Sequence, residues 1–287
     1  YSSREVADYL GQSQIGQALL ARTMFYSWIE FDGFMSMQQF AGSGVYNGIG
    51  NEQAVLGDQP VFGILYNHWR AGENFMSFRY AALASLDEKP TVDAFLSDYA
   101  RSAGIKDVAQ FTNAMKEVDA QSDARTLPGN IGFCIKGTWL IDPNQRTAPF
   151  WWWGKNDVDT AASRYQRVAQ NLQASLGEGV DPQYKRQLEL LVNRCQASYC
   201  HLKSIRTMQN ALIRFNTQTS TMPSDLTPEE KARIAQLCGE AGQYVQQYVR
   251  LTGQFMVDRG VEGFLINYYY GPPMLVHNFR AAYGEQG

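Results

Sequence analysis

The sequence predicts an α/β region followed by a mainly α region: the last β/α units of a TIM-type barrel, then an antiparallel helical bundle. Residues 22–31 and 61–67 are rich in aromatic and β-branched residues, and the 30-odd residues between them are enough for a crossover helix. Three long segments with helical periodicity follow residue 160. We therefore predict a barrel portion at 1–90, a helical and irregular connection at 91–160, and a bundle with a short tail at 161–287.

The first 86 residues alternate between helical and strand patterns. Apolar residues at helical spacing predict helices over residues 4–20, 35–56 and 73–86, although glycines weaken the second of them. The two strands lie between these helices. Because such alternation is typical of a parallel sheet, we expect the strands to be adjacent and parallel. A closed barrel has eight strands, so we also expect additional polypeptide to complete it.

The character of the chain changes after Pro90. Thr91 offers a helix start, and helices are expected over residues 91–103 and 107–118. Residues 120–160 are irregular, with several Gly and Pro residues and the run Trp151-Trp152-Trp153. We expect this run to pack in the core or between domains.

The bundle is predicted from three helical segments, at about 160–176, 181–214 and 227–257. In the second, the residues that share one face are Leu188, Leu191, Cys195, Leu202, Ile205 and Leu212. The third begins at a capping box, with Thr227 as the cap, Pro228 at the first helical position and Glu230 three residues after the cap. The charges on these helices are expected to face solvent.

The composition excludes several classes of function. The 25 Lys and Arg residues against 28 Asp and Glu residues leave a net charge of −3, which predicts neither a nucleic-acid partner nor binding to an anionic membrane. No apolar stretch is long enough to span a bilayer. The chain has no CxxC motif and only scattered histidines, so we expect no metal and no cofactor.

Polar and aromatic residues cluster where each predicted strand ends, which is the functional face of a parallel barrel. The first cluster is Trp28, Glu30 and Asp32; the second is Asn67, His68, Trp69, Arg70 and Glu73. An indole can stack on the apolar face of a sugar, polar side chains can bind its hydroxyls, and a carboxylate can act on the anomeric carbon. Two consecutive strands that end in this way favour a carbohydrate site over solvated loop charges.

These two clusters resemble those of the (β/α)8 glycoside hydrolases. Trp28-Ile29-Glu30-Phe31-Asp32-Gly33 is similar to the end of their seventh strand, and Tyr66-Asn67-His68-Trp69-Arg70 to the end of their eighth. The resemblance implies that Glu30 is the catalytic nucleophile and that Trp69 is the floor of the sugar subsite. Trp28, Asp32, Asn67, His68, Arg70 and Glu73 would line that subsite. The family's acid/base carboxylate is on the fourth strand, which this chain does not contain.

The predicted function is therefore that of part of a glycoside hydrolase, secreted or extracytoplasmic, that cleaves an oligo- or polysaccharide. Retaining and inverting mechanisms both stay open. The acid partner of Glu30 would come from additional polypeptide, from Asp32 or from Glu73. The alternative is a non-catalytic helical scaffold that binds a carbohydrate or a protein. Two parallel strands whose loops share a rim would favour the enzyme, and a wholly helical N-terminal region would exclude it.

Overall fold

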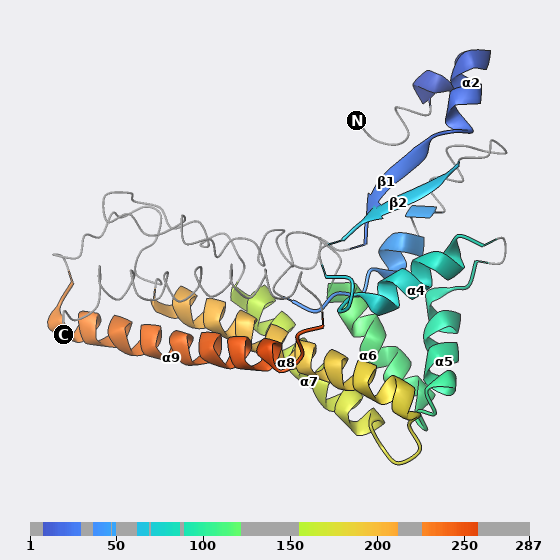
Figure 1. Ribbon diagram of the computed structural model, residues 1–287. Helices are drawn as coiled ribbons and strands as arrows, with labels where there is room; N and C mark the ends of the chain where they lie inside the picture. The colour runs from blue at the N-terminus through green and yellow to red at the C-terminus, as the bar shows by residue number, and fades with distance from the viewer. Residues whose placement is uncertain are drawn as a thin grey trace.

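The computed structural model in Figure 1 describes residues 8–29, 37–46, 48–49, 62–68, 70–86, 89–121, 155–211 and 226–257. The N-terminal elements are α2 (Gln14–Leu20), β1 (Met24–Trp28), β2 (Gly63–Asn67) and α4 (Phe75–Ala84). The remaining helices are α5 (Val92–Ser102), α6 (Val108–Gln121), α7 (Lys155–Ser175), α8 (Pro182–Ala211) and α9 (Pro228–Gly253). Helix therefore dominates the described part of the chain.

The prediction of barrel units is wrong. Strands account for only ten described residues, five in each of two strands, and these form a two-stranded sheet. The segments that follow the strands pack on helices instead of extending a sheet, and one hydrophobic core reaches from Ile29 to Ala241. A strand pattern predicts a strand, but its neighbours in space decide whether a barrel forms around it. The described core does not stop at residue 90.

The parallel pairing of the two strands is confirmed. Met24 pairs with Gly63, and the register continues without a bulge to Trp28 and Asn67. The N–H of Phe62 donates to the carbonyl of Thr23 at 3.2 Å, just before the ladder begins. Both strands therefore end at the same edge of the sheet (Figure 1).

The helices that flank the strands are shorter than predicted. Within the predicted helix 4–20, residues 11–13 form a turn, and Ser13 caps α2 by accepting from the N–H of Gly16 at 3.0 Å. Within the predicted helix 35–56, residues 38–41 are not helical, while residues 42–46 and 48–49 are. Phe40 anchors this segment in the core, where its ring lies against those of Tyr80 and Phe95.

Helices α5 and α6 form a hairpin that agrees with the prediction. The hydroxyl of Thr91 caps α5, accepting from the N–H of Ala94 at 3.2 Å. Gly104 follows α5 with a φ of +74°, a left-handed conformation that glycine adopts without strain. The N–H of Asp181 donates to the carbonyl of Ala103 at 2.9 Å, so this turn contacts the turn between α7 and α8.

Helices α7, α8 and α9 form the predicted antiparallel bundle, in which α8 contacts both of the others (Figure 1). Arg206, near the end of α8, contacts Asp159, near the start of α7, at 2.7 Å. Asn193, in the first half of α8, donates to the carbonyl of Leu251 at the end of α9, at 2.9 Å. These contacts require opposite directions for neighbouring helices.

The predicted buried face of α8 and the predicted capping box of α9 are also present. Leu191 and Leu202 are both buried, as their shared helical face predicts. The capping box of α9 forms as expected: Thr227 accepts from the N–H of Glu230, and the Glu230 carboxylate accepts from the N–H of Thr227. None of the described helices combines the length and the apolarity needed to cross a membrane.

Candidate functional site

The carboxyl edge of the two-stranded sheet is the candidate functional site. Trp28 and Asn67, the last residues of β1 and β2, are direct register partners. The backbone of both is described, whereas their side chains lie outside the described part of the structure. Glu30, Asp32 and Trp69 also lie outside the described residues. The structure thus shows that the backbones of Trp28 and Asn67 end the two strands side by side.

His68 is the first described side chain beyond β2, and it is exposed. Its imidazole ring meets the ring of Phe78 edge to face, with centroids 4.6 Å apart and an interplanar angle of 85°. Phe78 belongs to α4, so the first helix after the sheet supports this imidazole from one side. An exposed ring in this position is accessible to a ligand.

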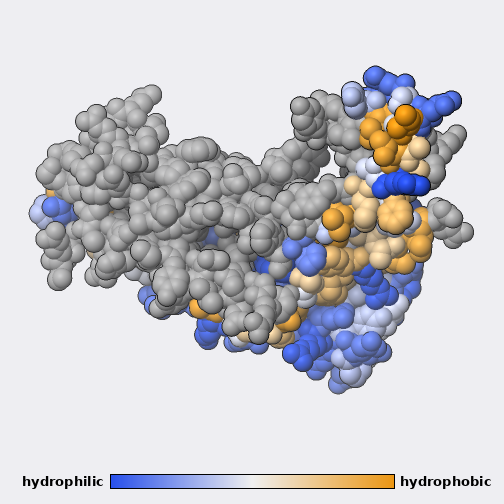
Figure 2. Space-filling view, turned by 45° about the horizontal axis from the view of Figure 1, so that its top comes forward, coloured by the Kyte–Doolittle hydropathy of each residue, from blue (hydrophilic) through white to orange (hydrophobic). Residues whose placement is uncertain are grey.

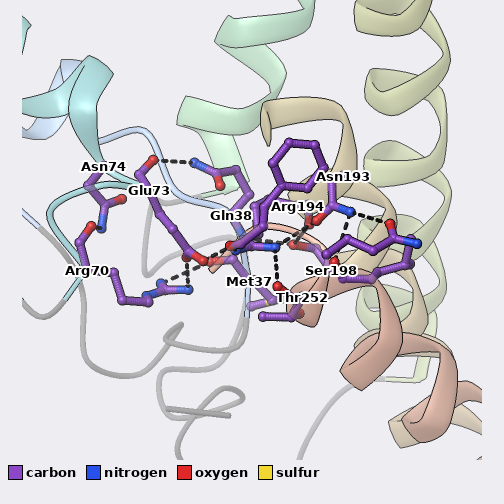
Figure 3. A network of polar contacts seen from close by, with 12 residues as sticks. Met37, Gln38, Arg70, Glu73, Asn74, Asn193, Arg194, Ser198 and Thr252 are labelled. Atoms are coloured by element: carbon purple, nitrogen blue, oxygen red, sulfur yellow. Dashed lines mark hydrogen bonds and ion pairs between the residues drawn. The ribbon is translucent and has the colours of Figure 1, made fainter. Parts of the chain in front are cut away.

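Arg70 and Glu73, in the segment between β2 and α4, are buried. Only 3% of Arg70 and 2% of Glu73 are exposed, and Arg70 Nη1 donates to Glu73 Oε2 at 2.7 Å. The other carboxylate oxygen, Oε1, accepts from Nε of Arg194 on α8. Both oxygens of Glu73 therefore bind arginines inside the protein (Figure 3). These contacts are internal, and a contact of Arg70 or Glu73 with substrate stays a prediction.

Arg194 was not expected in this site, because charges on the long helices were predicted to face solvent. It is only 3% exposed, and its guanidinium reaches the end of α9, donating to the carbonyls of Thr252, at 3.2 Å, and Phe255. A further bond runs to Asn193 Oδ1, at 2.7 Å. The sequence does contain a signal, because Arg194 lies three residues after Leu191 and four before Ser198, close to the apolar face of α8.

Residues 37–39, which follow β1, are bound at the same place. Ser198 Oγ accepts from the N–H of Gln38 at 2.7 Å, and the hydroxyl of Tyr165 on α7 donates to the carbonyl of Gln38, also at 2.7 Å. Gln38 Nε2 donates to the carbonyl of Gln39 at 2.9 Å and lies 3.5 Å from that of Glu73. The segments that follow both strands thus meet on one patch of the bundle (Figure 3).

The side chains around this network are buried. Burial raises the pKa of the Tyr165 phenol well above its ordinary value. Burial likewise raises the pKa of Tyr248, although the neighbouring guanidinium groups of Arg70 and Arg194 act in the opposite direction. A carboxylate held in such a place is stabilised by charge-assisted hydrogen bonds.

The remaining chemistry of the described residues is limited. Among them, no group of three or more His, Cys, Asp or Glu side chains could hold a metal ion. Cys195 and Cys200 are buried thiols, and burial raises the pKa of both. Low exposure and a raised pKa both disfavour nucleophilic use of a thiol. Neither a metal site nor a reactive thiol is therefore found among the described residues.

Comparison with known proteins adds no relative from which a function could be transferred. No protein-family model, curated protein or solved structure matches the chain.

Proposed function

We propose that the chain is part of a glycoside hydrolase and handles carbohydrate at the carboxyl edge of the β1–β2 sheet. The observation that supports this most is the parallel register, in which Trp28 is opposite Asn67. In parallel sheets, the loops after neighbouring strands share one rim, where ligands bind. Two adjacent parallel strands are what the enzyme hypothesis requires of this region, and they support it over the helical scaffold.

The proposed roles follow from counting along the chain. Trp28 and Asn67 are paired in the sheet. Glu30 comes two residues after Trp28, and Trp69 comes two residues after Asn67, so Glu30 and Trp69 are equally far along the chain from the paired residues. Neighbouring strands are roughly 5 Å apart, a spacing that suits a carboxylate beside a sugar-stacking indole. Glu30 is the proposed catalytic carboxylate and Trp69 the proposed sugar floor, with His68 at the rim.

The contacts of Glu73 reduce the number of candidates for the acid partner of Glu30. Both oxygens of Glu73 accept hydrogen bonds from buried arginines, which leaves Asp32 or a carboxylate from additional polypeptide. The two carboxyl groups of a glycoside hydrolase are about 5–5.5 Å apart in a retaining enzyme and about 6.5–9.5 Å apart in an inverting one.

The test is Glu30→Gln, which keeps the size of the side chain but removes its ability to attack. Turnover of aryl glycosides by the variant is expected to fall by several orders of magnitude below that of the native protein, because an amide can neither attack the anomeric carbon nor activate a water as a base. Oligosaccharide binding, measured by titration calorimetry, is expected to persist. The control is Glu178→Gln, because Glu178 is an exposed carboxylate in the turn between α7 and α8, a turn that Figure 1 shows away from the sheet. Normal turnover by the Glu30 variant would contradict the role.

A second candidate function is non-catalytic binding of a carbohydrate or a protein. It is favoured by the exposed apolar side chains on and next to the sheet, among them Met24, Phe62 and Leu65, which are 47%, 72% and 52% exposed. Figure 2 shows apolar residues gathered at the end of the molecule that contains α2 and the strands. Binding of oligosaccharide or protein without any turnover of aryl glycosides would support this candidate instead.

A further inference from the structure

The ionic network of Arg70, Glu73 and Arg194 joins parts of the chain that are far apart in sequence. Glu73 and Arg194 are separated by 121 positions, and Glu73 lies in the segment that leads from β2 into α4. Asn74 closes that segment on itself, because its Nδ2 donates to the carbonyl of Arg70 at 3.1 Å. The segment after β2 is thus bound both internally and to α8.

Arg194 is bound on its other side to the end of α9. Its contacts with the carbonyls of Thr252, in the last turn of α9, and Phe255, just beyond it, lie where the helix dipole is negative. The fork of the guanidinium therefore joins a helix end to the carboxylate of Glu73. Lysine, with a single ammonium group, does not reproduce that planar fork.

The network contains two guanidinium groups and one carboxylate, so the loss of each member has a different consequence. Arg70 and Glu73 form a neutral ion pair by themselves, so removal of Arg194 leaves no lone buried charge. Removal of Glu73 would leave two buried cations without their carboxylate, which is strongly unfavourable. Replacement of Arg194 is therefore the change that can release the segment while the protein stays folded.

We infer that Arg194 is a positioning residue, which acts through Glu73 to hold the segment after β2 and thereby the rim of the candidate site. Its side chain is buried, and its hydrogen bonds go to other groups of the protein. Its effect on ligand binding rests on the proposed function, whereas its effect on the segment does not. In this proposal, a helix of the bundle fixes the position of the segment after β2.

The test compares Arg194→Met with Leu188→Ala, a control in which a buried core residue of the same helix is truncated. Amide hydrogen exchange is followed by mass spectrometry in the full chain. In Arg194→Met, exchange over residues 66–75 is expected to rise by about tenfold beyond the rise in the control, because local opening becomes easier. Arg194→Lys, which keeps the charge but not the fork, is expected to fall between the native protein and Arg194→Met.

Ligand binding provides the second readout. Arg194→Met is expected to weaken the binding of the oligosaccharide used with Glu30→Gln by about tenfold, and Leu188→Ala to leave it near the native value, since only the former displaces the rim. An equal rise of exchange in both variants, or unchanged exchange over residues 66–75, would overturn the inference. So would a loosened segment with native affinity. If Arg194→Met does not fold, Arg194→Lys enters the same comparison.

The two hypotheses fail in different ways. If the native protein binds no oligosaccharide and turns over no glycoside, the proposed function fails, and the exchange comparison still decides whether Arg194 positions the segment. If Glu30→Gln abolishes turnover but Arg194→Met changes neither exchange nor binding, the proposed function stands and the inference fails.

Discussion

At the scale of single residues, the structure depends on a few close approaches that leave no space for change. Gly104 ends α5, and the turn it forms lies directly on the turn between α7 and α8. A Cβ added to Gly104 would lie 2.4 Å from the carbonyl oxygen of Gly179, which is backbone and cannot rotate away. The same residue has a positive φ, so both space and conformation require glycine.

Gly104→Ala is therefore expected to lower the free energy of unfolding by about 2 kcal/mol or more, the order of cost of a strained backbone conformation. Urea unfolding followed by circular dichroism measures the change. Gly177→Ala is the matched control, because a Cβ at Gly177 meets nothing within 4 Å. Equal stabilities of the two variants would show that the contact between the two turns contributes nothing.

At the scale of elements, the bundle depends on the face that α8 presents to its neighbours. Leu202 is fully buried, and so are Leu188 and Cys195 on the same helix. The apolar face reaches two neighbours: α7 on the main core, and α9, with which Ala197 and Cys200 form a second, smaller cluster. Burial of this face, more than helix propensity, stabilises a helix of this length.

Leu202→Ala is expected to cost about 2–5 kcal/mol, because it removes buried methyl groups and leaves a cavity between packed helices. The change is read from thermal or urea unfolding of the full chain. Leu86→Ala serves as the control: Leu86 is 59% exposed, and its truncation is expected to stay within about 0.5 kcal/mol of the native stability. A native-like Leu202 variant would contradict the packing of α8.

At the scale of the whole molecule, buried phenols and thiols make stability depend on alkaline pH. Burial raises the pKa of Cys200 from its ordinary value of 9.0 to about 11, and it raises the pKa values of Cys195, Tyr99, Tyr165 and Tyr248 as well. The folded protein retains these protons at a pH where the unfolded chain has already released them. The associated stability is complete below the ordinary pKa values and is lost as the pH rises through the raised ones.

The urea midpoint is accordingly expected to fall steadily as the pH is raised from about 8 to about 11, since the unfolded state then binds fewer protons than the folded state. Cys200→Ala removes one of these groups and is expected to make the fall shallower. A midpoint that stays constant or rises over this range would contradict the burial of these groups.

Local patterns in the sequence determined much of this protein. They located α4 to α9 and the two strands, because helical periodicity, turn residues and caps such as Thr227 act over a few positions. They also placed Trp28 and Asn67 at the ends of neighbouring parallel strands. The clusters named for the candidate site are contiguous in sequence, and that is why they could be found there.

Only the tertiary structure decided the rest. The two strands form no barrel in the described part of the chain, since the segments after them pack on helices. Arg70 and Glu73 were expected to face a sugar, and Arg194 to face water, yet all three are buried together. A charged side chain is buried only where a partner pairs with it, and the partner of Glu73, Arg194, is 121 residues away in the sequence. A local sequence pattern does not indicate which distant residue that partner is.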